Sequence, residues 1–146
     1  MNQADIRVKC AQEKVWRNIQ QGMQCGPACL KGLAETYEVS VCQEIEWESF
    51  LFTKGACVYD RCAAFQASAV LVGLWYGRTT PDIPRNRYRE AMKVISEIFR
   101  EQLGGYRCSE FRCCESENQK EIMDKIIKAT VEGLELVREN DSKKYF

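Results

Sequence analysis

The chain has 146 residues, nine cysteines and no histidine, and its 21 basic residues balance its 21 acidic ones. A chain of this length is expected to form a single domain, residues 1–146, with its own hydrophobic core. The balanced charge gives no general attraction for nucleic acid or an anionic membrane, so neither is expected as a partner. The absence of histidine excludes Cys–His and Ser–His–Asp catalysis, histidine-containing zinc sites and proximal-histidine haem ligation.

The N-terminal residues 1–18 contain no apolar core of the kind found in signal peptides. The longest apolar run, near Ala67–Tyr76, is too short to span a bilayer. We therefore expect a cytoplasmic protein without a membrane-spanning segment. In a reducing cytoplasm many cysteines indicate metal, cluster or thiol-exchange chemistry more than a disulfide scaffold.

Apolar residues at helical spacing predict helices along the chain, and no segment alternates as a strand does. The predicted fold is an all-α, single-domain helical bundle of about five or six helices. Candidate caps and glycine or proline breaks set the helix ends. The expected helices cover about residues 5–21, 27–37, 43–52, 62–76, 88–103 and 116–138.

The stretch from Phe52 to Arg78 contains a cysteine-bearing turn followed by a helix of small residues. Asp60 can cap this helix, which places Cys62 in the first turn. A helix N-terminus lowers the pKa of a thiol and favours the thiolate, the form that attacks disulfides or binds metals. Cys62 is therefore the first candidate for chemistry; the alternative is that it is a small buried hydrophobic residue.

Cys25 lies just before the next helix start that the sequence offers, because Pro27 suits the first turn of a helix. Cys29 shares a side with Cys25 if that turn is regular. Either the two cysteines form a reactive or metal-ligating pair, or Cys25 alone is functional and Cys29 is packed in the core. We favour core packing for Cys29. The remaining thiols before residue 100 match no recognisable spacing: Cys10, Cys42 and Cys57.

Three cysteines fall within seven residues behind Gly105: Cys108, Cys113 and Cys114. Their neighbours are mostly arginine, serine and glutamate, so core packing is a poor explanation for all three. A binding or redox role explains this segment better.

Three separated segments resemble the C_GCAxxG_C_C family, whose members are described as redox-active. The segments contain QCGPACLKGLAE, RCAAFQASAVLVGLWYG and YRCSEF, and a further cysteine precedes the last helix. The resemblance covers about Met23 to Val137. It implies that the four motif cysteines of the family are Cys25, Cys62, Cys108 and either Cys113 or Cys114.

The sequence departs from the family pattern in two places. Alanine stands where both glycines of the second motif are expected, within Cys62–Ala67, and the third and fourth cysteines are closer together than expected. The helical core is also similar to split-Soret cytochrome c proteins. Without histidine or a C-x-x-C-H motif, no haem is expected.

The leading hypothesis is that the motif cysteines converge at one end of the bundle and bind a metal or an iron–sulfur centre for electron transfer. Four sulfur ligands suit zinc or an iron–sulfur cluster, and a redox role favours iron because Zn²⁺ does no redox chemistry. The candidate catalytic residues are Cys62, Cys25 and Cys108. The candidate cofactor and metal ligands are Cys25, Cys62, Cys108, Cys113 and Cys114.

Two alternatives use the sequence differently. In the first, the same residues exchange dithiol and disulfide, with Cys62 attacking and Cys25 or Cys108 resolving. In the second, the chain is a non-catalytic helical interaction module, a homodimer for example, with Trp47 and Trp75 on the self-association face. For the metal-centre hypothesis and for dithiol–disulfide exchange the redox partner is unknown. The sequence does not decide whether the protein is an enzyme.

Overall fold

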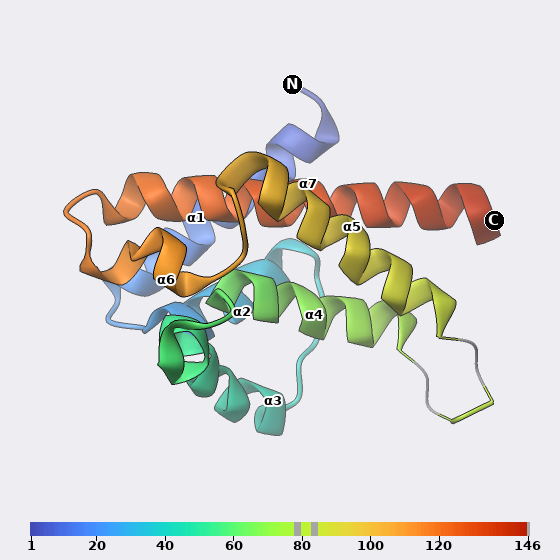
Figure 1. The fold of residues 1–146 in the computed structure, drawn as a ribbon, viewed down its shortest axis with the longest axis horizontal. Helices are drawn as coiled ribbons and strands as arrows, with labels where there is room; N and C mark the ends of the chain where they lie inside the picture. The colour runs from blue at the N-terminus through green and yellow to red at the C-terminus, as the bar shows by residue number, and fades with distance from the viewer. Residues whose placement is uncertain (78–79, 83–84, 146) are drawn as a thin grey trace.

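The computed structural model describes residues 1–77, 80–82 and 85–145, and for Cys114 and residues 143–145 it describes the backbone alone. This part of the chain contains seven α-helices and no strand (Figure 1). The all-α prediction is confirmed. The predicted number of helices, five or six, is too low.

The helices follow one another with short connections. The α-helices are α1 (Gln3–Gln20), α2 (Cys25–Thr36), α3 (Gln43–Glu48), α4 (Ala63–Tyr76), α5 (Asn86–Leu103), α6 (Cys108–Phe111) and α7 (Gln119–Tyr145). Three tighter or wider helical turns join them: η1 (Ser49–Phe52), η2 (Gly55–Tyr59) and η3 (Cys113–Glu115). The unpredicted helix is α6, a single turn that is too short for apolar residues to repeat at helical spacing.

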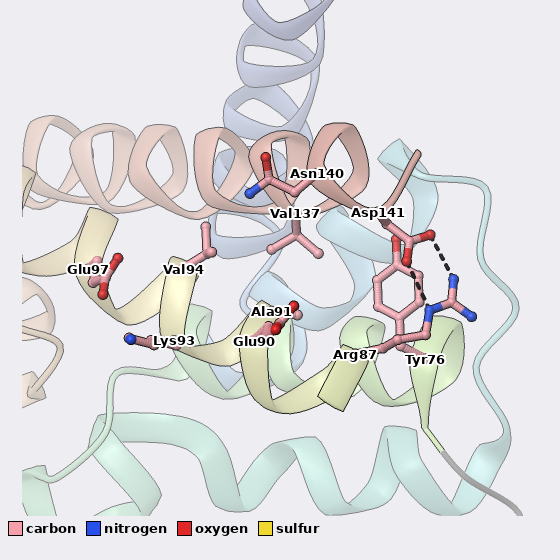
Figure 2. A pocket seen from close by; sticks show the side chains of 10 residues that line it. All are labelled: Tyr76, Arg87, Glu90, Ala91, Lys93, Val94, Glu97, Val137, Asn140 and Asp141. Atoms are coloured by element: carbon pink, nitrogen blue, oxygen red, sulfur yellow. Dashed lines mark hydrogen bonds and ion pairs between the residues drawn. The ribbon is translucent and has the colours of Figure 1, made fainter. Parts of the chain in front are cut away.

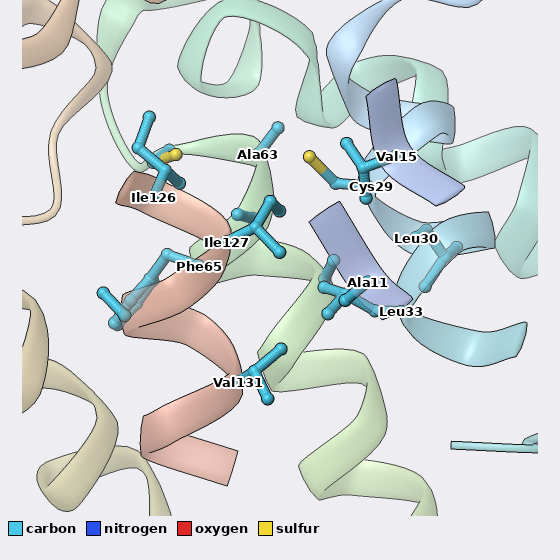
Figure 3. Close-up of a cluster of buried hydrophobic side chains, with 14 of the residues drawn as sticks. Ala11, Val15, Cys29, Leu30, Leu33, Ala63, Phe65, Ile126, Ile127 and Val131 are labelled. Carbon is cyan, nitrogen blue, oxygen red and sulfur yellow. The ribbon is translucent and has the colours of Figure 1, made fainter. Parts of the chain in front are cut away.

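The longest helix, α7, runs along most of the molecule (Figure 1). It packs against α1 and α5, while α2 packs against α1 and α4. The buried side chains of α7 recur at helical spacing and include Ile126, Ile127 and Leu134. Figure 3 shows α7 residues Ile127 and Val131 facing core side chains of other helices. Burial of these apolar side chains is the main term that stabilises such a bundle.

Gly26, in the first turn of α2, lets this helix lie close to η1. A Cβ atom at Gly26 would lie 2.0 Å from the carbonyl oxygen of Ser49. The Gly26 backbone N–H also donates a hydrogen bond to Thr53 Oγ1, at 3.2 Å. The start of α2 is thereby fixed against the segment that leads into η2.

Helix α4 is less buried than its apolar sequence predicts. Its first half is buried, but Leu74 in the last turn is 47% exposed. Trp75 is half-buried and packs edge-on against Tyr37, with 5.3 Å between ring centroids, so its predicted exposure is wrong. Trp47 on α3 is 60% exposed, as expected. None of the described helices is both long enough and apolar enough to cross a membrane.

Candidate functional site

Five cysteines line one small enclosed cavity; we call them the five-cysteine site. They are Cys25, Cys29, Cys62, Cys108 and Cys113. The cavity has a volume of about 20 Å³, roughly the space of one water molecule. The other wall residues are Gly55, Ala63, Phe111, Met123 and Ile126, so the surroundings of the sulfur atoms are apolar.

Two of these cysteines come from the start of α2. The helix begins at Cys25, two residues earlier than the sequence predicted, and Cys29 follows one turn further on. Cys29 is completely buried and Cys25 is 8% exposed. Packing was the favoured prediction for Cys29. The structure buries Cys29 and also places it in the cavity wall, so the helical spacing from Cys25 was the signal that pointed to it.

Cys62 and Cys108 are held together by a short strand-like pairing of two distant segments. Arg61 and Arg107 form an isolated antiparallel bridge. The N–H of Cys62 donates to the Tyr106 carbonyl at 2.8 Å, and the N–H of Cys108 donates to the Asp60 carbonyl at 2.6 Å. The prediction that Asp60 caps α4 is wrong: α4 begins at Ala63, and Cys62 itself occupies the cap position.

A turn with unusual backbone geometry closes the site from one side. Five of the six residues 54–59 have positive φ angles; they are Lys54, Gly55, Ala56, Cys57 and Tyr59. Each such residue other than glycine costs on the order of 1 kcal/mol. Gly55 is buried, and a Cβ atom there would lie 2.7 Å from Cys108 Cβ. The Lys54 N–H points at Cys25 Sγ, at a distance of 3.4 Å.

Four of the five thiols of this site have pKa values above the ordinary value of a cysteine. The pKa of Cys62 is raised to about 12, chiefly by burial. The Ala64 and Phe65 N–H groups lower this pKa, and the neighbouring thiols Cys25 and Cys108 raise it; about 12 is the net result. Burial likewise raises the pKa of Cys113 to about 12.

The other two site cysteines with a resolved shift behave in the same way. The pKa of Cys29 is raised, first by burial and then by the thiols around it. The pKa of Cys108 is raised too, chiefly by burial. The predicted lowering at Cys62 is therefore wrong, because desolvation outweighs the helix N-terminus.

Three further cysteines, Cys10, Cys42 and Cys57, do not line the cavity. Cys42 and Cys57 are exposed, and Cys10 is half-buried beside Thr36 Oγ1, at 3.9 Å from its sulfur. The side chain of Cys114 lies outside the described residues. Cys113, a candidate for the fourth motif cysteine, lines the cavity and is 5% exposed.

The donor set of the site suits a soft metal. Thiolates select zinc, iron and iron–sulfur clusters, and such sites use four sulfur ligands. Among the described residues, no group of three or more cysteines or carboxylates is already arranged to hold a metal ion. The side chains would have to rotate to bring their sulfur atoms to a metal–sulfur distance of about 2.3 Å from a common point.

Comparison with known proteins gave no match to a family model, to a curated protein or to a solved structure. The resemblance to the C_GCAxxG_C_C family therefore remains a prediction that rests on the segments quoted above.

Proposed function

We propose that the protein transfers electrons through an iron or iron–sulfur centre bound by thiolates of the five-cysteine site. One observation supports this above all: five cysteines from separate parts of the chain line the same enclosed cavity. No disulfide bond joins any of the eight cysteines whose side chains are described. Core packing alone would be served equally well by alanine or valine, and it gives no reason for five sulfur atoms to converge.

The chemistry of the buried thiols adds to this support. The sulfur of Cys25 is coupled to all four other thiols, since its charge contributes to the raised pKa values of Cys29, Cys62, Cys108 and Cys113. Crowded thiols in an apolar pocket resist ionisation unless a positive charge is shared among them. Bound iron supplies that charge and one-electron redox chemistry.

The chain's own residues have distinct tasks in this proposal. Cys25, Cys62, Cys108 and Cys113 are the proposed ligands, and Cys29 is a fifth sulfur in the wall. Met123 and Ile126 keep water from the sulfur atoms. Cys108 is the only half-exposed member of the site, so its edge is the shortest route for an electron to or from a partner.

The test is the metal content and visible spectrum of protein purified without oxygen. We expect iron, with acid-labile sulfide if the centre is a cluster, and broad visible absorption. The variants Cys25→Ser, Cys62→Ser, Cys108→Ser and Cys113→Ser should each lose most of the iron. Cys42→Ser and Cys57→Ser are matched controls, because these residues are exposed and outside the cavity, and should keep it. Protein that stays free of iron after anaerobic reconstitution would contradict the proposal.

Dithiol–disulfide exchange is the second candidate, and the half-exposed Cys108 favours it. A substrate disulfide would be reduced to two thiols while two site cysteines become one disulfide. Because Cys62 is buried and Cys108 is half-exposed, Cys108 is a better attacking thiol than the predicted Cys62. If metal-free protein loses the mass of two hydrogen atoms on oxidation and regains it on reduction, this candidate is favoured over an iron centre.

Self-association is supported by a different part of the surface. Four large apolar side chains of the α3–η2 region are exposed: Trp47, Phe50, Leu51 and Val58, at 60%, 55%, 63% and 72%. Light scattering of wild-type protein and of Trp47→Ser tests for a dimer. A wild-type protein that remains monomeric at high concentration would remove this candidate.

A further inference from the structure

A groove of about 670 Å³ lies beside the five-cysteine site, between α4 and α5. Its walls include Arg61, Phe65, Met92, Ser96, Arg100 and Tyr106. Arg61 directly precedes Cys62, and the Tyr106 carbonyl accepts the hydrogen bond of the Cys62 N–H. The groove and the cavity are thus built from adjoining residues, although the groove opens to the surface and the cavity is enclosed.

Two arginines give the groove a positive charge, and no acidic residue that lines the groove neutralises it. Arg61 and Arg100 both line it, no carboxylate does, and neither arginine forms an ion pair with any described residue. A concave surface with charges of one sign concentrates ligands of the opposite sign.

The groove on the other side of α5 is different. Figure 2 shows that Arg87 there is already bound to Asp141, through hydrogen bonds of 2.9 Å and 2.7 Å. Glu90 and Glu97 add further negative charge to its walls. That groove is lined by charges of both signs, with more carboxylates than cations, whereas the charged residues that line the groove with Arg61 and Arg100 are all cations.

The walls of the positive groove also present stacked aromatic rings. Phe65 and Tyr106 are stacked, with centroids 4.7 Å apart and planes inclined by 15°. The guanidinium of Arg100 lies over the Tyr106 ring, 5.3 Å from its centroid. Phe65 is anchored edge-on against the buried Phe99, with 5.4 Å between centroids. The apolar wall is therefore rigid, and one of the two cations is positioned on it.

We propose that this groove binds a planar aromatic anion, an aromatic ring system that carries a phosphate or carboxylate group. Its volume lies in the range of small-molecule sites. The planar guanidinium groups suit the bidentate binding of phosphate or carboxylate, and the aromatic and methionine side chains suit the ring. The proposal rests on the groove alone and does not require a metal at the five-cysteine site.

The test uses flavin mononucleotide and adenosine monophosphate as probes, with binding measured by calorimetry and, for the flavin, by fluorescence quenching. At least one probe should bind, and riboflavin, which lacks the phosphate, should bind more weakly than flavin mononucleotide. Arg61→Gln and Arg100→Gln should each weaken binding roughly tenfold, the effect of losing one charge-assisted hydrogen bond. Arg112→Gln is the matched control, because Arg112 is exposed, pairs with Glu115 and does not line the groove.

Each outcome decides the proposal. Binding that is weakened by the two groove variants and unchanged by Arg112→Gln supports it, as does weaker binding at raised salt. The proposal is overturned by the absence of binding for both nucleotides at millimolar concentration. It is equally overturned if riboflavin binds as tightly as flavin mononucleotide, or if all three variants weaken binding alike. An iron-free protein that still binds the probes would contradict the proposed function and leave this proposal standing.

Discussion

The two halves of α7 border two regions that bury polar groups in different surroundings: thiols among apolar side chains in one, and paired charges with aromatic rings in the other. Near its start, Met123 and Ile126 cover the five-cysteine site. About 12 residues and roughly 18 Å further along the helix, Glu135 and Arg138 belong to a network of charges and aromatic rings. Arg7 pairs with Glu135 at 2.6 Å, and the Tyr37 hydroxyl donates to the same carboxylate at 3.1 Å.

The charged network is complete within the chain. Arg138 lies over the rings of Tyr37 and Trp75, at 5.5 Å and 5.2 Å from their centroids. Burial and the charge of Glu135 raise the pKa of Tyr37, so its hydroxyl stays a donor. Each charge has an opposite charge or a ring beside it. The thiols of the five-cysteine site are surrounded mainly by apolar atoms and by one another, so a bound cation would stabilise their thiolate forms. At the other end of α7 the carboxylates already have cations beside them, so a further cation would gain less there.

The pH dependence of stability offers the strongest test of this contrast. In an unfolded chain a thiol loses its proton near pH 8.5, whereas folded Cys62 keeps its proton up to about pH 12. Between these values the unfolded state binds fewer protons, so stability falls as pH rises. From pH 8 to pH 11 the metal-free, reduced wild type should lose about 3 kcal/mol more than Cys62→Ala does.

Urea unfolding at a series of pH values measures this difference. Cys42→Ala should follow the wild type, because Cys42 is exposed. Parallel curves for the wild type and Cys62→Ala would show that Cys62 is not buried as a neutral thiol, and the contrast between the two regions would fail.

Glycine substitutions test how closely the backbone packs around the five-cysteine site. Gly55→Ala places a methyl group 2.7 Å from Cys108 Cβ and at a positive φ angle, and we expect a loss of about 2 kcal/mol. Gly26→Ala should cost a similar amount through its contact with Ser49. Gly73→Ala is the control, since a methyl group there meets no atom within 4 Å, and it should stabilise the helix by about 0.5–1 kcal/mol.

Thermal or urea unfolding of the three variants measures these effects. If Gly55→Ala proved as stable as Gly73→Ala, the turn at residues 54–59 would not press against Cys108 as the structure has it.

The charged region gives the smallest expected effect. Asp141→Asn removes the carboxylate that binds Arg87 with two hydrogen bonds, and because the pair is partly exposed we expect a loss of about 1 kcal/mol. Glu121→Gln breaks the exposed pair with Lys125 and should cost no more than about 0.5 kcal/mol. Urea unfolding in low and high salt compares the two variants. A larger loss for Glu121→Gln than for Asp141→Asn would contradict this ranking.

The sequence was sufficient for the long helices, because their apolar residues repeat over several turns. α5 is an example: Ile95 and Phe99 on its buried face are one turn apart. The single turn α6 and the tight turns η1 to η3 could not be predicted in this way, since they are shorter than the pattern that identifies a helix. Helix α7 also continues to Tyr145, whereas the expected helix ended near residue 138.

The site was predictable in part. Helix starts and the family resemblance selected Cys25, Cys62, Cys108 and one cysteine of the 113–114 pair, and the structure brings Cys25, Cys62, Cys108 and Cys113 together. Packing was favoured for Cys29 over a shared site with Cys25, because a spacing of four residues fits both. The raised pKa values were not predictable, since they depend on burial by helices far away in the sequence.

The strand-like pairing at Arg61 and Arg107 has a consequence for how the assembly of the site can be observed. The amide protons of Cys62 and Cys108 are donated across this pairing, to the carbonyls of Tyr106 and Asp60. They are protected from exchange with deuterium only while the two segments are docked. Their exchange rates therefore report, without any label or change at sulfur, how often the folded protein opens its cysteine site.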